Sequence, residues 1–230
     1  MTAVARGLFV AGTDTGVGKT CVATALLRAL AAAGVRAVGM KPVAAGIAAD
    51  HAVAGDVAAL AAADGLDVPL ADRNPYGFAP AIAPHLAARD AGTTIDVDVI
   101  AAAYARLARL ADVVVVEGAG GVLVPLGDRG DMLDVPLRLD VPVLLVVGIR
   151  LGCLNHALLS ARAIRERGVR GAGWVANRLD PRMPRADDNV AELTQRLGTP
   201  PVADFPWGGA AAAARRALVA LSLAAAQQCR

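Results

Sequence analysis

The chain has 230 residues, of which 56% are hydrophobic and 3% aromatic, and its formal net charge is +2. This length is enough to bury a sizeable core, and we expect one domain over residues 1–230. The small charge argues against a bulk nucleic-acid surface, and apolar runs such as 141–148 fall short of the ~20 residues that span a bilayer, so we expect neither partner.

Short valine-rich runs alternate along the chain with longer alanine-leucine segments. We expect strands at 6–12, 36–43, 112–118, 141–148, 171–179 and 201–204. We expect helices at 18–33, 53–63, 96–111, 154–167, near 187–197 and at the C-terminus, with the proline-rich connection "NPYGFAPAIAP" at 74–84. This alternation predicts an α/β fold, with a mostly parallel sheet and helices on both faces.

The first predicted strand leads into "GTDTGVGKT", residues 12–20, whose tail is typical of a phosphate-binding loop. The standard G-x-x-x-x-G-K-[ST] pattern needs a glycine where this chain has Thr13, and Gly12 lies one residue early. Gly16 and Gly18 would still free the backbone to point N–H groups at phosphate oxygens.

The two residues that follow this loop carry the expected chemistry. Lys19 can reach the β- and γ-phosphates, and the Thr20 hydroxyl suits Mg²⁺. The helix that starts near Gly18 adds its positive end. The alternative is a glycine-rich turn with a solvated lysine, but strand, loop and helix together favour a P-loop NTPase type of fold.

Polar residues collect where the predicted strands end. Asp14 and Thr15 follow the first strand, Lys41 ends the second, Glu117 closes "VVVVE" and Asn177 ends "GWVAN". Ligands of open parallel sheets bind outside the carboxyl ends of the strands, so we expect these groups on one rim.

Three of the polar positions admit more than one interpretation. Glu117 is placed to face a metal, or to accept backbone N–H groups of the "GAGG" that it precedes. Asp56 is placed to contact a metal or to cap its helix. Lys41 would supply a second ammonium group to a phosphoryl group, or would be an exposed strand-end lysine.

The remaining histidines and cysteines indicate no metal site. His51, His85 and His156 are scattered, and Cys21, Cys153 and Cys229 lack C-x-x-C spacing, which favours a reducing compartment. The N-terminus is no signal peptide, so we predict a cytoplasmic protein. The helix start at Asn155 could bind a carboxylate through free N–H groups, or Asn155 could simply cap it.

Six segments together resemble the dethiobiotin synthetase family: "GTDTGVGKT", "KPVAAG", "NPYGFAPAIAPH", "VVVEGAGG", "LGCLNHALL" and "GWVAN". They occur in that family's order, and the likeness runs to "FPW" at 205–207. The family also uses the shifted glycine loop. The resemblance implies ATP- and Mg²⁺-dependent closure of a cyclic urea from CO₂ and 7,8-diaminononanoate. The route would be a carbamate and a carbamic-phosphoric anhydride, within biotin biosynthesis and in a homodimer with its active site at the subunit interface.

The resemblance also implies roles for individual residues. The catalytic residues would be Lys41, Lys19 and Thr15, and the metal-site residues Thr20, Asp56 and Glu117. Nucleotide contacts would come from Thr13, Asp14, Thr15, Gly16, Val17, Gly18, Lys19, Thr20, Glu117, Gly118, Ala119, Gly120, Asn177 and Pro206. Substrate contacts would come from Lys41, Ala45 and, in the second subunit, Gly152, Cys153, Leu154 and Asn155. Some members have glutamate at the position of Gly16 and serine at that of Ala45, and both side chains contact ligands there. In this chain those contacts would come from the backbone or from water, or would be absent.

Two other classes share parts of this pattern. Nucleotide-switch ATPases of the partitioning or positioning kind have a similar loop, but they carry a signature lysine where this chain has Asp14. The segment 211–228 could be taken for their membrane helix, but its polar face consists of little more than one arginine pair, which favours a packing helix. Related cofactor-precursor synthetases often carry an amidotransferase domain, for which this length leaves no room.

Overall fold

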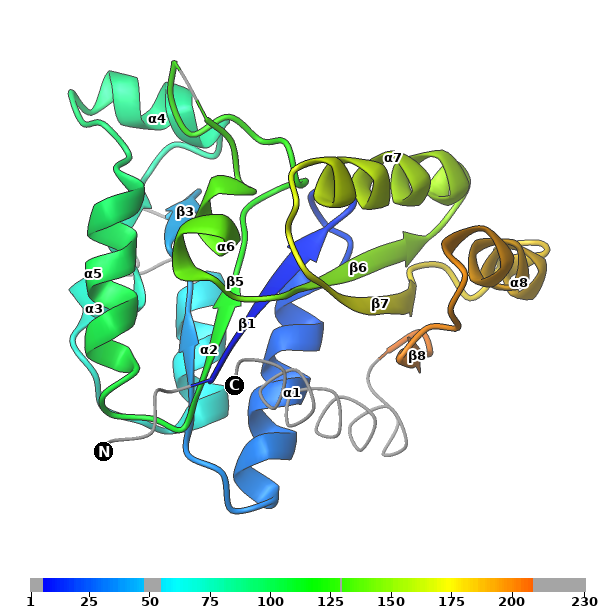
Figure 1. Cartoon of the computed structure of the whole chain (residues 1–230), viewed down its shortest axis with the longest axis horizontal. Coiled ribbons are helices and arrows are strands. Elements are labelled where there is room, and N and C mark those ends of the chain that lie inside the picture. The colour runs from blue at the N-terminus through cyan, green and yellow to red at the C-terminus, as the bar shows by residue number, and fades with distance from the viewer. Residues whose placement is uncertain (1–5, 48–54, 129, 209–230) are drawn as a thin grey trace.

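A six-stranded, all-parallel sheet forms the centre of the protein (Figure 1). The computed structural model describes residues 6–47, 55–128 and 130–208. The strand order is β2-β5-β1-β6-β7-β8. The bounds are β1 Arg6–Gly12, β2 Ala37–Met40, β5 Val113–Glu117, β6 Val143–Ile149, β7 Gly171–Arg178 and β8 Ala203–Phe205.

A second, two-stranded parallel sheet pairs β3 (Val43–Ala45) with β4 (Tyr76–Phe78). The described helices are α1 Lys19–Ala32, α2 Gly55–Asp64, α3 Leu70–Arg73, α4 Pro84–Asp90, α5 Val97–Leu107, α6 Asp134–Leu139, α7 Cys153–Glu166 and α8 Ala186–Leu197. The predicted C-terminal helix lies outside the described residues.

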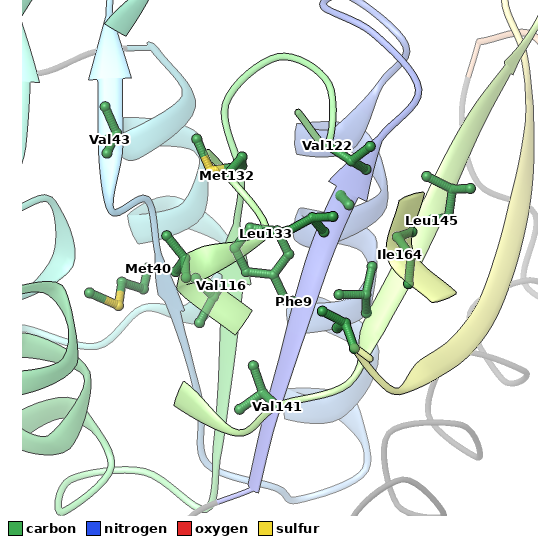
Figure 2. Close-up of a cluster of buried hydrophobic side chains, with 14 of the residues drawn as sticks. Phe9, Met40, Val43, Val116, Val122, Met132, Leu133, Val141, Leu145 and Ile164 are labelled. Carbon is green, nitrogen blue, oxygen red and sulfur yellow. The ribbon is translucent and has the colours of Figure 1, made fainter. Parts of the chain in front are cut away.

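Alternation along the central strands divides the core between the two faces of the sheet. Leu8 and Val10 of β1 pack with α1 and with Leu60 of α2. Phe9 belongs to the larger cluster on the opposite face, where α5, α6, α7 and α8 contribute, and Figure 2 shows it beside Val116 and Leu133. Strands that are buried on both faces explain why their sequences are continuously apolar.

The same alternation directs two polar side chains toward α1. Val113 and Val115 of β5 lie on the α1 face, so the next residue in that series, Glu117, points to the same side. A Cβ added to Gly39 of β2 would lie 2.8 Å from the Leu60 side chain of α2, so position 39 faces α1 and α2. Lys41 follows two residues later and therefore points to the same face. The strand periodicity therefore brings Glu117 and Lys41 together on the side where α1 begins.

The fold-class prediction is confirmed: this is an α/β protein with a parallel sheet and helices on both faces. The prediction of one strand over 36–43 is wrong, because β2 ends at Met40 and the chain enters the second sheet at Val43. Pro42 lies at this break, where its lack of an N–H prevents a continued ladder. The connection 74–84 contains β4 and the start of α4, and α3 and α6 were also not predicted.

Among the described residues, no helix is both long enough and apolar enough to cross a membrane.

Candidate active site

A cavity of about 680 Å³ opens at the carboxyl ends of β1, β2 and β5. It joins the loop before α1 to the end of β2, the start of α2 and the segment after β5. Its lining residues are Thr15, Gly16, Gly18, Lys19, Thr20, Lys41, Ala44, Ala45, Asp56, Ala81, Ile82, Ala83, Pro84, Glu117, Ala119, Gly120 and Val124.

The loop between β1 and α1 depends on its glycines for shape. Gly16 has φ 73° and Gly18 has φ 90°, a left-handed region that favours glycine. An added Cβ at Gly18 would lie 2.1 Å from the side-chain nitrogen of Asn177, whose Nδ2 donates to the Val17 carbonyl oxygen over 2.8 Å. The end of β7 therefore packs directly against the loop, and a larger residue at position 18 would displace Asn177.

Lys19 extends its ammonium group across this loop. Its Nζ donates to the carbonyl oxygens of Asp14 and Gly120, each over 2.9 Å. Burial, followed by the nearby charge of Lys41, lowers the pKa of Lys19 to about 8. An anion bound in the loop would favour the charged form. Lys19 is therefore placed to hold a phosphate at the start of α1.

A second group of charges lies beside it. The Lys41 Nζ contacts Glu117 Oε1 at 2.6 Å, Asp56 Oδ2 at 2.8 Å and the Gly118 carbonyl oxygen at 3.1 Å. The Thr20 hydroxyl donates within the same group, with Asp56 Oδ1 at 2.9 Å and Glu117 Oε1 at 2.8 Å. Lys41 is only 3% exposed, so the alternative of an exposed strand-end lysine is wrong.

The two carboxylates differ in their surroundings. Burial raises the pKa of Glu117, against the opposing effect of Lys41. Burial also acts to raise the pKa of Asp56, but the charge and hydrogen bond of Lys41, with the Thr20 hydroxyl, outweigh it and hold that pKa below its ordinary value. Both side chains point to Lys41 and Thr20, and within the described residues Glu117 accepts no hydrogen bond from the backbone N–H groups of "GAGG".

One oxygen in this group suits a cation. Glu117 is fully buried, and its Oε2 has no hydrogen-bond partner among the described residues. Such an atom costs free energy unless something polar meets it. The described part of the chain holds no group of three or more His, Cys, Asp or Glu side chains that could by themselves bind a metal ion. Two carboxylates with a hydroxyl fit Mg²⁺, which typically binds one or two carboxylates plus phosphates.

The structure leaves some predicted residues outside this cavity. Gly152, Cys153, Leu154 and Asn155 form the start of α7 and are not among the described residues that line it. Asn155 does not cap α7, since the cap position is Gly152 and no side-chain cap bond forms. Pro206 lines a different cavity of about 520 Å³, next to Arg178 and Trp207.

Thr13 and Asp14 belong to the loop before α1 but do not line the cavity. The Thr13 N–H donates to the Val146 carbonyl oxygen over 3.0 Å, which ties the loop to β6. The Asp14 carboxylate accepts the Thr15 N–H over 2.7 Å and pairs with Arg150 at 2.5 Å. In switch ATPases the signature lysine occupies the position of Asp14, so this chain has an acid, already paired, in its place.

Sequence reasoning missed the wall formed by the second sheet and the connection after it. Ala44 and residues 81–84 line the cavity, yet small apolar residues give no chemical signal in a sequence. Arg150 was also missed, because a lone arginine after a strand is typical of many surfaces. The order of "KPVAAG" and "NPYGFAPAIAP" could have indicated the wall only if their pairing as β3 and β4 had been foreseen.

Solved structures of low identity share the fold. The ParA family ATPase of Chlorobium tepidum covers 96% of this chain and 98% of its own, with a TM-score of 0.57 and 17% identity. The cell division ATPase MinD of Pyrococcus furiosus covers 98% of this chain and 99% of its own, with a TM-score of 0.53 and 19% identity. At these identities the likeness establishes the P-loop NTPase type of fold and nothing about partners.

Sequence relatives are much closer. The ATP-dependent dethiobiotin synthetase of Nitrosospira multiformis is 52% identical over 202 residues, covering 88% of each chain. That of Xanthomonas euvesicatoria is 48% identical over 213 residues, covering 91% of this chain and 94% of its own. A family model described as an AAA domain matches residues 6–215. With this site, this fold and these relatives, the chain belongs to the ATP-dependent dethiobiotin synthetase family.

Proposed function

We propose that this protein uses ATP to close the cyclic urea of dethiobiotin from 7,8-diaminononanoate and CO₂, as a step of biotin biosynthesis. The observation that carries the proposal is the convergence of Lys19 and Lys41 on one cavity, next to a phosphate-binding loop and the Glu117–Asp56–Thr20 group. Family membership supports the same activity.

The nucleotide would bind with its phosphates in the loop of residues 13–20. Lys19 would exchange its two carbonyl partners for phosphate oxygens, and the N-terminus of α1 would add its positive end. Thr15, Ala119 and Gly120 lie on the rim of the same cavity. Gly118 would contribute through its backbone. Asn177 and Pro206 lie toward β7 and β8 and would contact the base.

Thr20, Asp56 and Glu117 would hold Mg²⁺. The positive charges of the two lysines and the negative charges of the two carboxylates in the cavity cancel. The charge of the ion would therefore be needed to offset that of the triphosphate. When bound, the ion supplies charge stabilisation at the phosphoryl group. The buried Glu117 Oε2, which has no hydrogen-bond partner in the described ranges, supports this assignment.

The chemistry needs no protein nucleophile. One amine of the substrate adds CO₂ and loses a proton to give a carbamate, and a carbamate oxygen attacks the γ-phosphorus of ATP and releases ADP. The second amine then attacks the carbonyl carbon of the carbamic-phosphoric anhydride and loses a proton, and inorganic phosphate leaves as the ring closes. Lys41 would bind the carbamate and the transferred phosphoryl group, whose like charges otherwise repel. Ring closure is favoured because the second amine is tethered to the activated carbon.

The alkyl chain of the substrate would lie along the apolar wall of Ala44, Ala45 and residues 81–84. With alanine at position 45, that residue offers packing and no side-chain hydrogen bond. The substrate carboxylate would bind the N-terminus of α7, Gly152 to Asn155, of a second subunit, in a cytoplasmic homodimer. That these residues do not line the cavity of their own chain is compatible with this arrangement.

The test is a search by mass spectrometry for the cyclic urea, together with phosphate release measured with each component left out. We expect phosphate release to require ATP, Mg²⁺, bicarbonate and the diamine together. Phosphate release that ignores the diamine and bicarbonate, with no urea formed, would contradict the proposal and favour the nucleotide-switch class.

A further inference from the structure

The segment "NPYGF", residues 74–78, does not line the cavity, yet it contacts the residue that carries the second ammonium group. The Asn74 Nδ2 donates to the Lys41 carbonyl oxygen over 2.6 Å and to the Tyr76 carbonyl oxygen over 3.1 Å. The Arg73 carbonyl oxygen accepts the Lys41 N–H over 2.8 Å. Both backbone polar groups of Lys41 are therefore bound by two consecutive residues.

Lys41 needs these partners because it lies beyond the sheet. β2 is an edge strand, and its register with β5 ends at the pair Met40 and Val116. Pro42, the next residue, has no N–H to offer. Since Lys41 is only 3% exposed, water does not satisfy its backbone, and buried backbone groups are almost always paired. The side chain of Asn74 thus replaces the missing ladder bond at this point.

Arg73 and the preceding residue, Asp72, are themselves held by contacts to other elements. The Arg73 guanidinium pairs with the Asp64 carboxylate at the end of α2, with distances of 2.5 and 3.2 Å, and donates to the Gly39 carbonyl oxygen over 2.8 Å. Asp72 accepts from Arg106 of α5 over 2.6 Å. The short helix α3 is therefore tied to α2, β2 and α5, which makes it a rigid support.

The neighbouring strand leaves room for the Asn74 side chain. An added Cβ at Gly77 would lie 2.7 Å from Asn74 Oδ1. The absence of a side chain at Gly77 therefore admits the amide between β4 and the end of β2. The Tyr76 N–H also donates to the Pro42 carbonyl oxygen over 3.1 Å, which continues the same contact into the second sheet.

We infer that Asn74 is a positioning residue for Lys41: its amide fixes the Lys41 carbonyl, and so directs the ammonium group at Glu117 and Asp56. Asn74 touches no reacting atom and acts through Lys41 alone. The activity readouts of this inference rest on the proposed function, but its structural readout does not.

The main test substitutes Asn74→Ala and Asn74→Asp in the full chain. Asn74→Asp keeps the size but turns an acceptor toward two carbonyl oxygens, so it separates the loss of the donor from the loss of volume. We expect kcat for urea formation to fall by about 10–100-fold in both, the range for partners that orient a functional group. The KM for ATP should stay at its wild-type value.

A double-mutant cycle decides whether the effect passes through Lys41. In a Lys41→Ala background, Asn74→Ala should lower the residual turnover no further. Two control variants reproduce the loss of a hydrogen bond and the loss of buried volume away from Lys41. Asn189→Ala removes the same kind of amide-to-carbonyl bond on α8, and Leu193→Ala removes a buried side chain there. Both should leave kcat unchanged at a temperature where the protein is folded.

The structural readout is a crystal structure of Asn74→Ala, in which the Lys41 Nζ should have left Glu117 Oε1. If Asn74→Ala does not fold, Gly77→Ala displaces the amide more gently and should lower kcat in the same direction. The inference would be overturned by an unchanged kcat in Asn74→Ala, or by a Lys41 side chain that has not moved in its crystal structure. It would also be overturned if Asn74→Ala lowered turnover by the same factor in the Lys41→Ala background as in the wild type. Absence of any urea from the wild-type protein would instead refute the proposed function, and the crystal structure would still decide the role of Asn74.

Discussion

Lys19 and Lys41 bring their ammonium groups to the same cavity from different surroundings. Lys19 lies on a glycine-rich loop and donates to the neutral carbonyl oxygens of Asp14 and Gly120. Lys41 lies at the end of an edge strand and pairs with the carboxylates of Glu117 and Asp56. Neutral partners are readily exchanged for a phosphate, whereas carboxylates hold a lysine in place before any nucleotide arrives. This difference suggests that Lys19 serves nucleotide binding and Lys41 the transferred group.

Removing each ammonium group in turn separates the two roles. Lys41→Ala should cost about 3–4 kcal/mol of transition-state stabilisation, similar to the loss of one oxyanion-hole donor, and should leave ATP binding largely intact. Lys19→Ala should weaken ATP binding as well as turnover. Steady-state kinetics combined with calorimetric ATP titrations measure both effects. Equal loss of ATP affinity in the two variants would show that the lysines are not specialised.

A second substitution tests the carboxylate that holds Lys41. Glu117→Gln removes the charge from a buried side chain whose Oε2 has no partner within the described residues. We expect the Mg²⁺ concentration needed for half-maximal activity to rise by about 10–100-fold, the range for losses around a metal ligand. A Mg²⁺ titration of activity measures this. The control is Glu192→Gln, an exposed carboxylate on α8 paired with Arg196, which should leave the Mg²⁺ dependence unchanged.

How these lysines are held could be predicted from the sequence only in part. Glu117 and Lys41 each end a predicted strand, and the strand period of two places them on the α1 face with Thr20. A family resemblance added roles for Asp56 and Asn177. Lys41, Glu117 and Asn177 could be predicted because each ends an apolar run, whose position in a parallel sheet is nearly fixed.

The support beneath Lys41 could not be predicted. β3 and β4 have three residues each, too few to show a period, and α3 has four. The pairing of Val43 with Tyr76 spans a long stretch of chain, and only the fold brings the two together. The strand prediction over 36–43 failed for a related reason: the apolar pattern continues through Pro42, although the hydrogen-bonded ladder does not.

The lowered pKa of Lys19 predicts a pH dependence of ATP binding. Burial, followed by the charge of Lys41, lowers this pKa to about 8 in the nucleotide-free protein, against the raising effects of Glu117, Asp56 and Asp14. A bound triphosphate favours the charged form and raises the pKa. Above about pH 8, ATP binding should therefore take up a proton, and ATP affinity should fall by up to about tenfold per pH unit.

Calorimetry in two buffers of different ionisation enthalpy measures this proton uptake. We expect uptake approaching one proton at about pH 9 and little at about pH 7, where Lys19 is already charged in the free protein. The Lys19→Ala variant provides the control and should show no difference between the buffers. Binding without proton uptake at the higher pH would mean that Lys19 stays charged without nucleotide, and that its two carbonyl partners hold it more strongly than its burial disfavours it.

The smallest expected effect concerns the contact between the loop and β6. Asp14 and Arg150 form an ion pair at 2.5 Å, with side chains 45% and 44% exposed. Exposed pairs contribute about 0.2–1 kcal/mol and weaken with salt. A double-mutant cycle of Asp14→Asn and Arg150→Gln, read out as ATP affinity, should give a coupling in this range that disappears at high salt. The Arg162–Glu166 pair on α7 is a matched exposed pair and should show no coupling to ATP. A larger coupling that resists salt would mean that the pair is shielded from water in the working enzyme, as a second subunit at the nearby start of α7 would cause.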